Sequence, residues 1–394
     1  MANLSNRIVI IGAGPVGLAF ALAAARLPGA EVTVLERRPL TTSPTTEGFD
    51  HRVYALSPGS RALLEELEVW SLLDSTRIAP IRAMHVFGDA GAEQAGEINF
   101  SQGSPLAFIV EHAALMNALQ AAVSAQSDRI QVIDKAEVVA IDFADSAGAA
   151  KIRLADQISL AAELLVAADG NASRVRCMAG IDTQVKDYGS DGIVANFSAA
   201  RGHGGVARQW FSAQGVLAYL PLPRDQVSIV WSVKVGRATE LEELDTTAFS
   251  AAVAAAGNHT LGELTLTSSR TRIALKRVTA ARWVQPGLAL IGDAAHSIHP
   301  LAGQGANLGF ADVRALFTEL RDRSPLSRPG DLAVLRRYER ARREDALAMG
   351  EITDKLHSLY LSDAPLAKVV RRNGLNRINR LSATKAMLIA HAIK

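Results

Sequence analysis

The feature that most constrains the fold is a glycine pattern near the start of the chain. Gly12-x-Gly14-x-x-Gly17 follows an apolar run, Arg7–Ile11, and leads into a helical stretch, Leu18–Arg26. Gly12 permits a tight turn after a strand, Gly14 lets the backbone approach a pyrophosphate, and Gly17 lets the helix pack closely on the sheet. In this strand–turn–helix context the pattern predicts a dinucleotide-binding unit rather than an ordinary glycine-rich turn.

The residues after this helix complete the unit. A second apolar run, Glu31–Leu35, predicts the next strand and ends at Glu36. An acidic side chain about 20 residues beyond the glycines typically binds ribose hydroxyls, so Glu36 and its neighbour Arg37 are candidate cofactor-binding residues. Because Pro15 and the glycines break the apolar run, we interpret this segment as folded structure and not as a signal peptide.

A second segment has the same strand–loop–helix order. The apolar run Leu288–Ile291 predicts a buried strand, which ends at Gly292-Asp293 and is followed by a loop rich in Pro and Gly. The carboxylate of Asp293 can accept hydrogen bonds from sugar-like hydroxyls. The glycines from Gly303 to Gly309 let backbone N–H groups approach an anionic ring edge, where the dipole of the following helix favours negative charge. Together with the first motif, this segment predicts a flavoprotein.

Length and composition restrict the class of protein further. The chain has 394 residues, more than one hydrophobic core usually fills, so two domains are expected. A net charge of +2 argues against a general nucleic-acid binder. The single cysteine, Cys177, excludes an intramolecular disulfide and fits a reducing compartment. Since glycine or proline breaks every apolar run that approaches roughly 18 residues, we expect no transmembrane helix and a cytoplasmic protein.

The order of patterns predicts an α/β fold, in which a Rossmann-like cofactor domain is interrupted by a β-sheet substrate domain and followed by C-terminal helices. Leu164–Ala168 predicts a strand buried on both faces, and Ile130–Phe143 with the runs after it predicts an antiparallel meander. The predicted domains are residues 1–70, 111–177 and 281–350 for the cofactor, residues 71–110 and 178–280 for the β-rich substrate domain, and residues 351–394 for a C-terminal helical segment.

Three motifs in this order resemble those of the single-component, FAD-dependent aromatic hydroxylases of the para-hydroxybenzoate hydroxylase type. They are the first glycine motif with Glu36, the segment Asp169–Arg176, which resembles a DGxxSxxR element, and the segment Gly292–Gly309. Residues 296–309, HSIHPLAGQGANLG, resemble the narrower ubiquinone-biosynthesis branch, whose members oxidise polyprenyl phenols, and residues 48–52 and 337–343 do so as well. The likeness covers essentially the whole chain.

The resemblance implies a cofactor and a reaction. FAD would be reduced by NAD(P)H and would react with O₂ to form a flavin hydroperoxide, which hydroxylates the aromatic ring of a lipid-tailed phenol in ubiquinone biosynthesis. Because the chain has no second GxGxxG motif, we expect transient nicotinamide binding, with NADH and NADPH both open.

The resemblance also assigns residues to this chemistry. Arg52 is expected to pair with the pyrophosphate or the ring system, and Asp169, with Arg176 beside it, to tie its loop to the cofactor domain. The expected cofactor-binding residues are Gly12, Gly14, Gly17, Glu36, Arg37, Arg52, Asp169, Asp293, Gly303, Gly305, Ala306 and Asn307. The expected catalytic residues, against the flavin ring and the substrate, are Pro300, Gly303, Gln304 and Gly305. One departure is Glu111, where many relatives place an Arg about four residues before a Leu.

Several residues have a less specific interpretation. His296 and His299 have HxxH spacing but no third ligand, so we reject a metal site and expect His296 to be a hydrogen-bonded structural residue. Trp231 and Phe211 could line an apolar pocket, although core packing is the simpler interpretation.

The end of the chain combines basic and apolar residues. Residues 364–394 contain no Asp or Glu and carry Lys368, Arg371, Arg372, Arg377, Arg380, Lys385 and Lys394. Such a segment either docks peripherally on an anionic surface such as the inner membrane or packs on the cofactor domain with a solvated basic face.

Other functions stay open on the same fold. The protein could hydroxylate another small aromatic compound, or it could be a non-catalytic FAD-binding member of a biosynthetic complex. A flavin-dependent halogenase is set aside, because the four tryptophans do not form that family's paired-Trp element. The oligomeric state is open.

Overall fold

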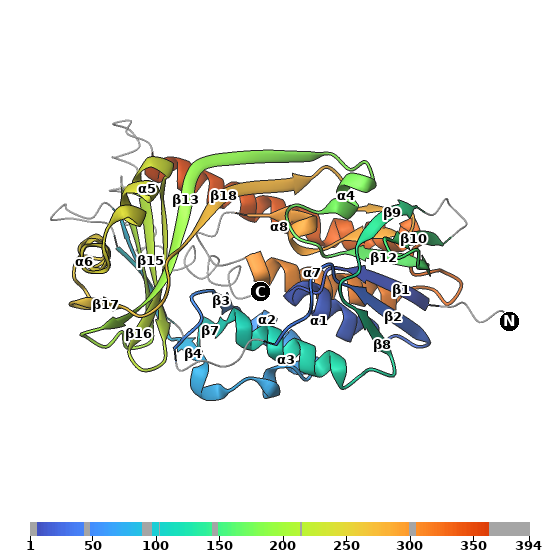
Figure 1. The fold of residues 1–394 in the computed structure, drawn as a ribbon, viewed down its shortest axis with the longest axis horizontal. Coiled ribbons are helices and arrows are strands. Elements are labelled where there is room, and N and C mark those ends of the chain that lie inside the picture. The colour runs from blue at the N-terminus through green and yellow to red at the C-terminus, as the bar shows by residue number, and fades with distance from the viewer. Residues whose placement is uncertain are drawn as a thin grey trace.

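Two sheets dominate the architecture. The computed structural model describes residues 6–42, 48–88, 97–101, 103–143, 149–212, 215–298 and 305–361. A mainly parallel sheet and a larger, mainly antiparallel sheet lie at opposite ends of the long axis, and β13 (Thr183–Ala199) and β18 (Thr271–Ala280) run side by side between them (Figure 1). The predicted α/β fold class is confirmed.

The parallel sheet contains the predicted strand–helix–strand unit. Its strand order is β19-β20-β12-β1-β2-β8, with β19 antiparallel to β20 and the other pairs parallel. Every residue of β12 is buried, as predicted for a strand between two neighbours. The strands are β1 (Asn6–Ile11), β2 (Ala30–Leu35), β8 (Ile130–Ile133), β12 (Leu164–Ala167), β19 (Val284–Gln285) and β20 (Leu288–Leu290).

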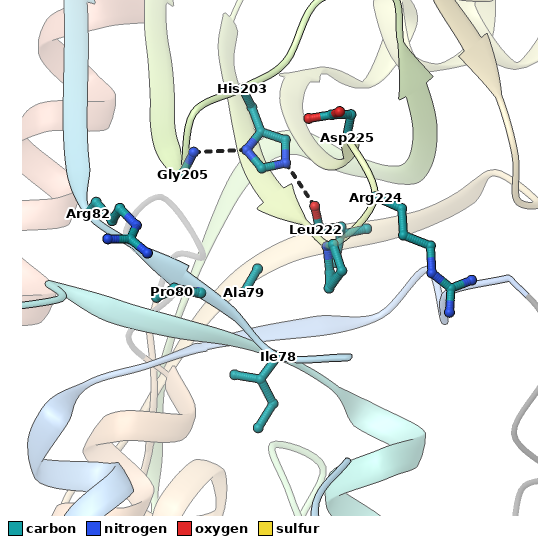
Figure 2. A pocket seen from close by; sticks show the side chains of 10 residues that line it. Ile78, Ala79, Pro80, Arg82, His203, Gly205, Leu222, Arg224 and Asp225 are labelled. Carbon is teal, nitrogen blue, oxygen red and sulfur yellow. Dashed lines mark hydrogen bonds between the residues drawn. The ribbon is translucent and has the colours of Figure 1, made fainter. Parts of the chain in front are cut away.

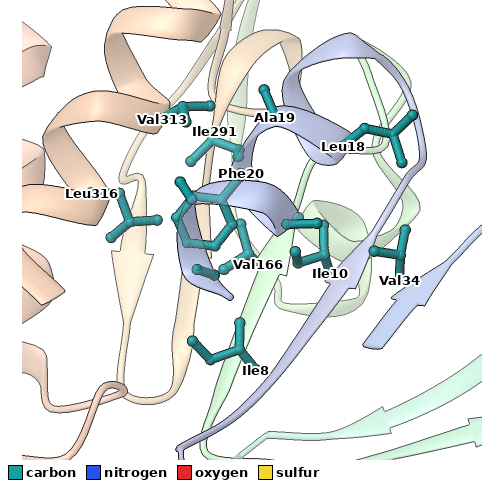
Figure 3. Close-up of a cluster of buried hydrophobic side chains, with 14 of the residues drawn as sticks. Ile8, Ile10, Leu18, Ala19, Phe20, Val34, Val166, Ile291, Val313 and Leu316 are labelled. Atoms are coloured by element: carbon teal, nitrogen blue, oxygen red, sulfur yellow. The ribbon is translucent and has the colours of Figure 1, made fainter. Parts of the chain in front are cut away.

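Three helices pack beside this sheet and close the main core. Helix α1 (Pro15–Ala24) contacts both α3 (His112–Ser124) and α7 (Gly305–Arg321). Fully buried apolar side chains such as Ile10 and Phe20 fill the space between the strands and these helices (Figure 3). Because most of α1 is small and apolar, it can be buried nearly all round, and this fixes its N-terminus against the ends of the strands.

The large sheet has the strand order β21-β18-β13-β16-β15-β14-β5-β6, and β17 also pairs with β13. Helices α5 (Val235–Glu243) and α6 (Thr246–Ala256) cover one face (Figure 1). Trp231 is buried in the core that the sheet forms with these helices, in agreement with the core-packing interpretation. The remaining strands are β5 (Ala83–Gly88), β6 (Glu97–Ser101), β14 (Val206–Ser212), β15 (Gly215–Leu222), β16 (Gln226–Lys234), β17 (Leu264–Leu266) and β21 (His296–Ser297).

A small sheet, β3-β7-β4, packs against the large one. Ile109 of β7 and Phe49, in the loop before β3, form a cluster with Ala207 and Leu222 of the large sheet. On the opposite side it leads into α2 and α3, so it lies between the large sheet and the helices of the cofactor unit. The elements are β3 (Val53–Leu56), α2 (Pro58–Glu66), the short helices η1 (Trp70–Leu72) and η2 (Ser75–Arg77), β4 (Ala79–Ile81) and β7 (Ala107–Glu111).

The predicted meander is correct only in part. Strands β9 (Val138–Asp142), β10 (Ala150–Leu154) and β11 (Ser159–Ala162) form an antiparallel three-stranded sheet. The inclusion of Ile130–Ile133 is wrong, because these residues form β8 and pair in parallel with β2. The chain leaves β8 through Lys135, whose φ of 54° lies in the left-handed region, and so separates two apolar runs that look continuous in the sequence.

The division into domains stays our proposal. It is supported by the origin of the strands, since the parallel sheet draws on residues 6–35, 130–133, 164–167 and 284–290, whereas most of the large sheet comes from residues 83–101 and 183–280. The short strand β21 differs from the proposed division, because it lies in the last cofactor segment but pairs with β18 of the large sheet.

Helix α8 (Leu332–Leu361) ties the two ends of the molecule together. Its Asp354 accepts hydrogen bonds from Lys186 Nζ (3.0 Å), from Arg277 Nη1 (2.9 Å) and from the Tyr188 hydroxyl, all on β13 or β18. Burial favours a raised pKa for Asp354, but these three donors outweigh it and lower the pKa. None of the described helices combines the length and apolar character needed to cross a bilayer.

The Asp354 cluster predicts a stability change. Asp354→Asn leaves the Arg277 and Lys186 cations without a carboxylate, so we expect the free energy of unfolding at pH 7 to fall by about 1–3 kcal/mol. Because the pKa of Asp354 is lowered in the folded state, its stabilisation is present above the unfolded pKa and disappears as the pH falls through the folded value. Urea unfolding from pH 7 to pH 3 should therefore show the two proteins converging, and a constant gap would contradict this role.

Candidate cofactor site

The glycine turn has the geometry that its sequence predicts. Gly12 has a φ of +108°, and a Cβ there would lie 2.4 Å from the carbonyl oxygen of Ala168. A Cβ at Gly17 would lie 2.0 Å from the carbonyl oxygen of Gly12, so close packing of the helix on the turn requires glycine. A Cβ at Gly14 would meet no atom within 4 Å, so the backbone faces open space at this position.

Glu36 lies at the edge of this turn. Its Oε2 accepts a hydrogen bond from the N–H of Ala13 (2.8 Å), and its Oε1 accepts one from the N–H of Arg38 (2.9 Å). The carboxylate is half-buried, and the neighbouring Arg37 is exposed. Both carboxylate oxygens keep further acceptor capacity, which suits them to the paired hydroxyls of a ribose.

The second motif lies beside the first. After β20 the chain forms the turn η3 (Gly292–Ala294), and a Cβ at Gly292 or at Gly309 would contact the side chain of Val16 at the start of α1. Asp293 in this turn has an exposed side chain, although the protein around it raises the pKa of its carboxyl group by desolvation. An accessible carboxylate that is poorly solvated gains from hydroxyl donors supplied by a ligand.

A buried carboxylate holds the turn in place. Asp312 accepts hydrogen bonds from the N–H of Gly292 (3.0 Å), from His296 Nε2 (2.7 Å) and from Arg342 Nε (2.9 Å). Burial favours a raised pKa for Asp312, but these partners outweigh it and the pKa is lowered. The prediction that His296 is a hydrogen-bonded structural residue is confirmed. The centroid of its ring lies 4.6 Å from that of Trp283, with the two rings tilted by 31°. His299 lies outside the described residues, and among those described no three ligands converge on a metal position.

The start of α7 faces the same region. Backbone N–H groups in a first helical turn have no acceptor within the helix, and the dipole favours negative charge there. The side chain of Asn307 is turned inward, where Oδ1 accepts from the N–H of Ser57 (2.9 Å) and from the Ser60 hydroxyl (2.8 Å), and Nδ2 donates to Ala55 (2.9 Å). Gly305 and Ala306 lie beside it in this turn, whereas Pro300, Gly303 and Gln304 lie outside the described residues.

Arg52 reaches the site from the loop before β3. Its side chain is exposed, and its guanidinium lies 5.7 Å from the ring centroid of Tyr54. The positive charge of Arg52 lowers the pKa of the Asp293 carboxyl, although desolvation is the larger effect, so the two groups are close enough to interact. The role of Arg52 in binding the cofactor stays a prediction, which its electrostatic interaction with Asp293 supports.

A buried ion pair positions this loop. Arg77 pairs with Glu111 through Nε and Nη2, at 2.7 and 2.8 Å, and Glu111 also accepts a hydrogen bond from the N–H of Asp50 (2.7 Å). Asn196 of the large sheet donates to the carbonyl oxygens of Phe49 (3.0 Å) and Asp50 (2.9 Å). The Glu111 carboxylate therefore anchors the loop that carries Arg52. This role accounts for a glutamate at the position where many relatives have an Arg.

Asp169 has a local role in the structure. It accepts hydrogen bonds from the Ser173 hydroxyl (2.5 Å) and from the backbone N–H groups of Arg174 (2.8 Å) and Val175 (3.2 Å). It thus supplements Ser173, the N-cap of the short helix α4 (Arg174–Met178). The tie to the cofactor turn is made by Arg176, which donates to the carbonyl oxygen of Ala294 (2.7 Å).

Sequence reasoning missed Tyr54 and His112. The Tyr54 hydroxyl lies 2.8 Å from His112 Nδ1, and both side chains are half-buried beside Arg52. Tyr54 could have been found from its spacing, because residues two apart on a strand share a face and Arg52 directly precedes β3.

A separate pocket of about 320 Å³ opens at the junction of β4 with the hairpins of the large sheet (Figure 2). Arg82 and Arg224 line it, and so does His203. The His203 ring is held in place because Nδ1 accepts a hydrogen bond from the N–H of Gly205 (3.0 Å) and Nε2 lies 2.8 Å from the carbonyl oxygen of Leu222. None of the predicted site residues lines this pocket.

Comparisons with known proteins agree with this site. Residues 6–352 match the family model described as FAD binding domain. The chain is 31% identical to 3-demethoxyubiquinol 3-hydroxylase of Escherichia coli (strain K12), over 100% of both chains. It is also 31% identical to the mitochondrial ubiquinone biosynthesis monooxygenase COQ6 of Mus musculus, over 98% of this chain and 90% of that one.

A solved structure matches the fold over nearly its whole length. Klebsiella pneumoniae HpxO complexed with FAD and uric acid has a TM-score of 0.75 and 20% identity, covering 98% of this chain and 97% of that chain. Fold and site together define an FAD-dependent monooxygenase. The chain belongs to the FAD-binding family that includes the hydroxylases and monooxygenases of ubiquinone biosynthesis.

The second and third glycines of the first motif, Gly14 and Gly17, give a matched pair of variants. Gly14→Ala adds a methyl group in open space, so the protein should fold with unchanged stability while its FAD dissociation constant rises at least tenfold. Gly17→Ala forces a methyl group against Gly12 and should lower the free energy of unfolding by about 2 kcal/mol or more. Thermal unfolding of the apoprotein and flavin fluorescence titration separate the effects, and equal FAD affinity for Gly14→Ala and the unmodified protein would exclude the proposed pyrophosphate position.

Proposed function

We propose that this protein is an aromatic-ring hydroxylase that acts on a polyprenyl phenol in ubiquinone biosynthesis, with NAD(P)H as electron donor and O₂ as oxidant. The observation that carries the proposal is the convergence of the glycine turn, the accessible Asp293 and the start of α7 around Val16. The choice of substrate class is supported by 31% identity, over nearly the whole chain, to 3-demethoxyubiquinol 3-hydroxylase and to the ubiquinone biosynthesis monooxygenase COQ6.

Each part of the site would hold one part of FAD. The open backbone at Gly14 and the N-terminus of α1 suit the pyrophosphate, Glu36 suits the adenosine ribose, and Asp293 suits the hydroxyls of the ribityl chain. When bound, FAD accepts electrons from NAD(P)H and activates O₂ for transfer of one oxygen atom to the ring of the substrate. The first-turn N–H groups of α7 would stabilise negative charge on the flavin ring.

The protein contributes positioning and charge rather than a nucleophile. Arg52 supplies a positive charge close to Asp293, and the loop that carries it is fixed by the Arg77–Glu111 pair and by Asn196 of the large sheet. The same loop therefore links the cofactor site to the sheet that we assign to the substrate. Pro300, Gly303 and Gln304 are proposed to complete the site over the flavin ring.

The proposed reaction predicts a single-component enzyme. Purified protein with FAD, NAD(P)H and a prenylated phenol should consume O₂ and yield a product heavier by one oxygen atom, measured with an oxygen electrode and mass spectrometry. Asp293→Ala is the control, because removing an exposed carboxylate should abolish flavin binding while the protein stays folded. Turnover of small phenols but not prenylated ones would favour the alternative aromatic substrate, and a dependence on a partner reductase would contradict the single-component mechanism.

We further propose that the basic residues of the C-terminal segment, residues 364–394, contact an anionic membrane surface. Each Lys or Arg near such a surface contributes about 1 kcal/mol. Truncation after Leu361 should weaken co-sedimentation with anionic vesicles while FAD stays bound, and added salt should weaken vesicle binding of the full chain. Equal vesicle binding with and without the segment would end this proposal, and loss of flavin on truncation would show that the segment packs on the cofactor domain.

A further inference from the structure

The pocket beside β4 shares no lining residue with the predicted cofactor site. Three segments line its volume of about 320 Å³, namely β4 with the residues next to it, the turn that carries His203, and the turn between β15 and β16. These walls are tied together, because Nε2 of His203 bonds the carbonyl oxygen of Leu222 (2.8 Å) and the N–H of Arg82 donates to the carbonyl oxygen of Gly205 (2.8 Å). The pocket is therefore built into the fold.

Three charged side chains of both signs line this pocket. Arg82, Arg224 and Asp225 are exposed, and within the described ranges none of them forms an ion pair or a side-chain hydrogen bond. His203 adds no charge, because its Nδ1 accepts a hydrogen bond from the N–H of Gly205 (3.0 Å) and the ring hydrogen is then on Nε2. In Figure 2 Arg82 lies on the Gly205 side of His203 and Asp225 lies on the other side, so opposite charges line different walls.

The turn that carries Arg224 and Asp225 has an unfavourable backbone conformation. The φ angles of these residues are 60° and 53°, in the left-handed region that favours glycine and asparagine. The Arg224 guanidinium lies 5.9 Å from the centroid of the Phe49 ring. Backbone strain of this kind is concentrated at ligand sites, so the turn is a candidate for contact with a bound molecule and is more than a connection between strands.

The floor of the pocket is apolar. Ile78, Pro80 and Pro223 are half-buried, so part of their apolar surface stays open beside the charged groups. Guanidinium groups suit a phosphodiester, because arginine donates paired hydrogen bonds to phosphate oxygens. The carboxylate of Asp225 suits a primary ammonium group, which has three N–H donors. A ligand with both groups next to apolar carbon pairs every charge in the pocket, whereas Asp225 would repel a simple anion.

We propose that this pocket binds the headgroup of phosphatidylethanolamine, with the phosphodiester at Arg82 and Arg224 and the ammonium group at Asp225. The apolar floor then contacts the glycerol and the first carbons of the acyl chains. The choice of a membrane lipid as the source of this headgroup rests on the lipid-tailed substrate proposed above, because such a substrate is reached at a membrane. The site is separate from the basic C-terminal segment and recognises a different lipid.

The test compares two kinds of vesicle without net charge, so that the basic C-terminal segment contributes equally to both. Full-length protein with FAD bound is co-sedimented with vesicles of phosphatidylcholine alone or of phosphatidylcholine mixed with phosphatidylethanolamine. Only phosphatidylethanolamine has a primary ammonium group, so the mixed vesicles should bind the protein about threefold more tightly, as expected for an exposed ion pair. Since no substrate is present, this result and the proposed hydroxylation can fail independently.

Variants assign the preference to the pocket. Asp225→Asn should abolish it, and this variant should fold because asparagine tolerates the left-handed conformation at least as well as aspartate. Arg82→Gln should weaken binding to both kinds of vesicle, because both lipids contain the phosphodiester. Asp128→Asn is the matched control, since this exposed carboxylate lies in the turn before β8 of the parallel sheet, and the variant should keep the full preference.

Three results would overturn the inference. Equal binding of the unmodified protein to the two kinds of vesicle would show that the ammonium group is not recognised. A preference that survives in Asp225→Asn would show that lipid packing, and not the pocket, produces it. A micromolar dissociation constant for soluble phosphoethanolamine, measured by calorimetry and raised by Arg82→Gln, would assign the pocket to a free phosphoester in place of a membrane lipid.

Discussion

The cofactor site depends on one buried carboxylate. Asp312 has no exposed surface. A buried carboxylate is stable in its charged form only if hydrogen-bond donors surround its oxygens. Its donors come from three different segments, namely the turn after β20, the strand that contains His296, and α8 through Arg342. Fixing these three donors around one carboxylate sets the path of the Gly292 turn, and thereby the position of Asp293.

Two aspartates in this region have opposite electrostatic environments. Asp312 is fully enclosed but well supplied with donors, so its pKa is lowered, whereas Asp293 is accessible but poorly solvated, so its pKa is raised. The hydrogen bonds of Asp312 stabilise the fold, whereas the carboxylate of Asp293 can still accept hydrogen bonds from a ligand. In the sequence both residues are simply aspartates close to a glycine. The opposite shifts of their pKa values arise from residues that are near them only in the folded structure.

The sequence predicted the local parts of the site and not the contacts between distant segments. The turn at Gly12, the buried strand β12 and the helix after Gly292 follow from short patterns, because turns and periodicity are set by neighbouring residues. Ile130–Ile133 belongs to the parallel sheet and not to the predicted meander for two reasons. Lys135 adopts a left-handed conformation that redirects the chain, and the strand pairs with β2, about 100 residues earlier in the sequence. The inward turn of Asn307 and the Tyr54–His112 pair likewise require partners that no local pattern reveals.

Helix α8 has a mechanical consequence for the enzyme. Arg342 bonds the carboxylate beneath the cofactor turn, and Asp354, twelve residues later, bonds the ribbon of β13 and β18 that leads to the large sheet. At 1.5 Å per residue these two anchor points are about 18 Å apart on one continuous helix. Any rotation of the large sheet relative to the parallel sheet would have to bend this helix or release one of its anchors, so a rigid helix, and not only the surrounding loops, sets the distance between the parts of the molecule that we assign to cofactor and substrate.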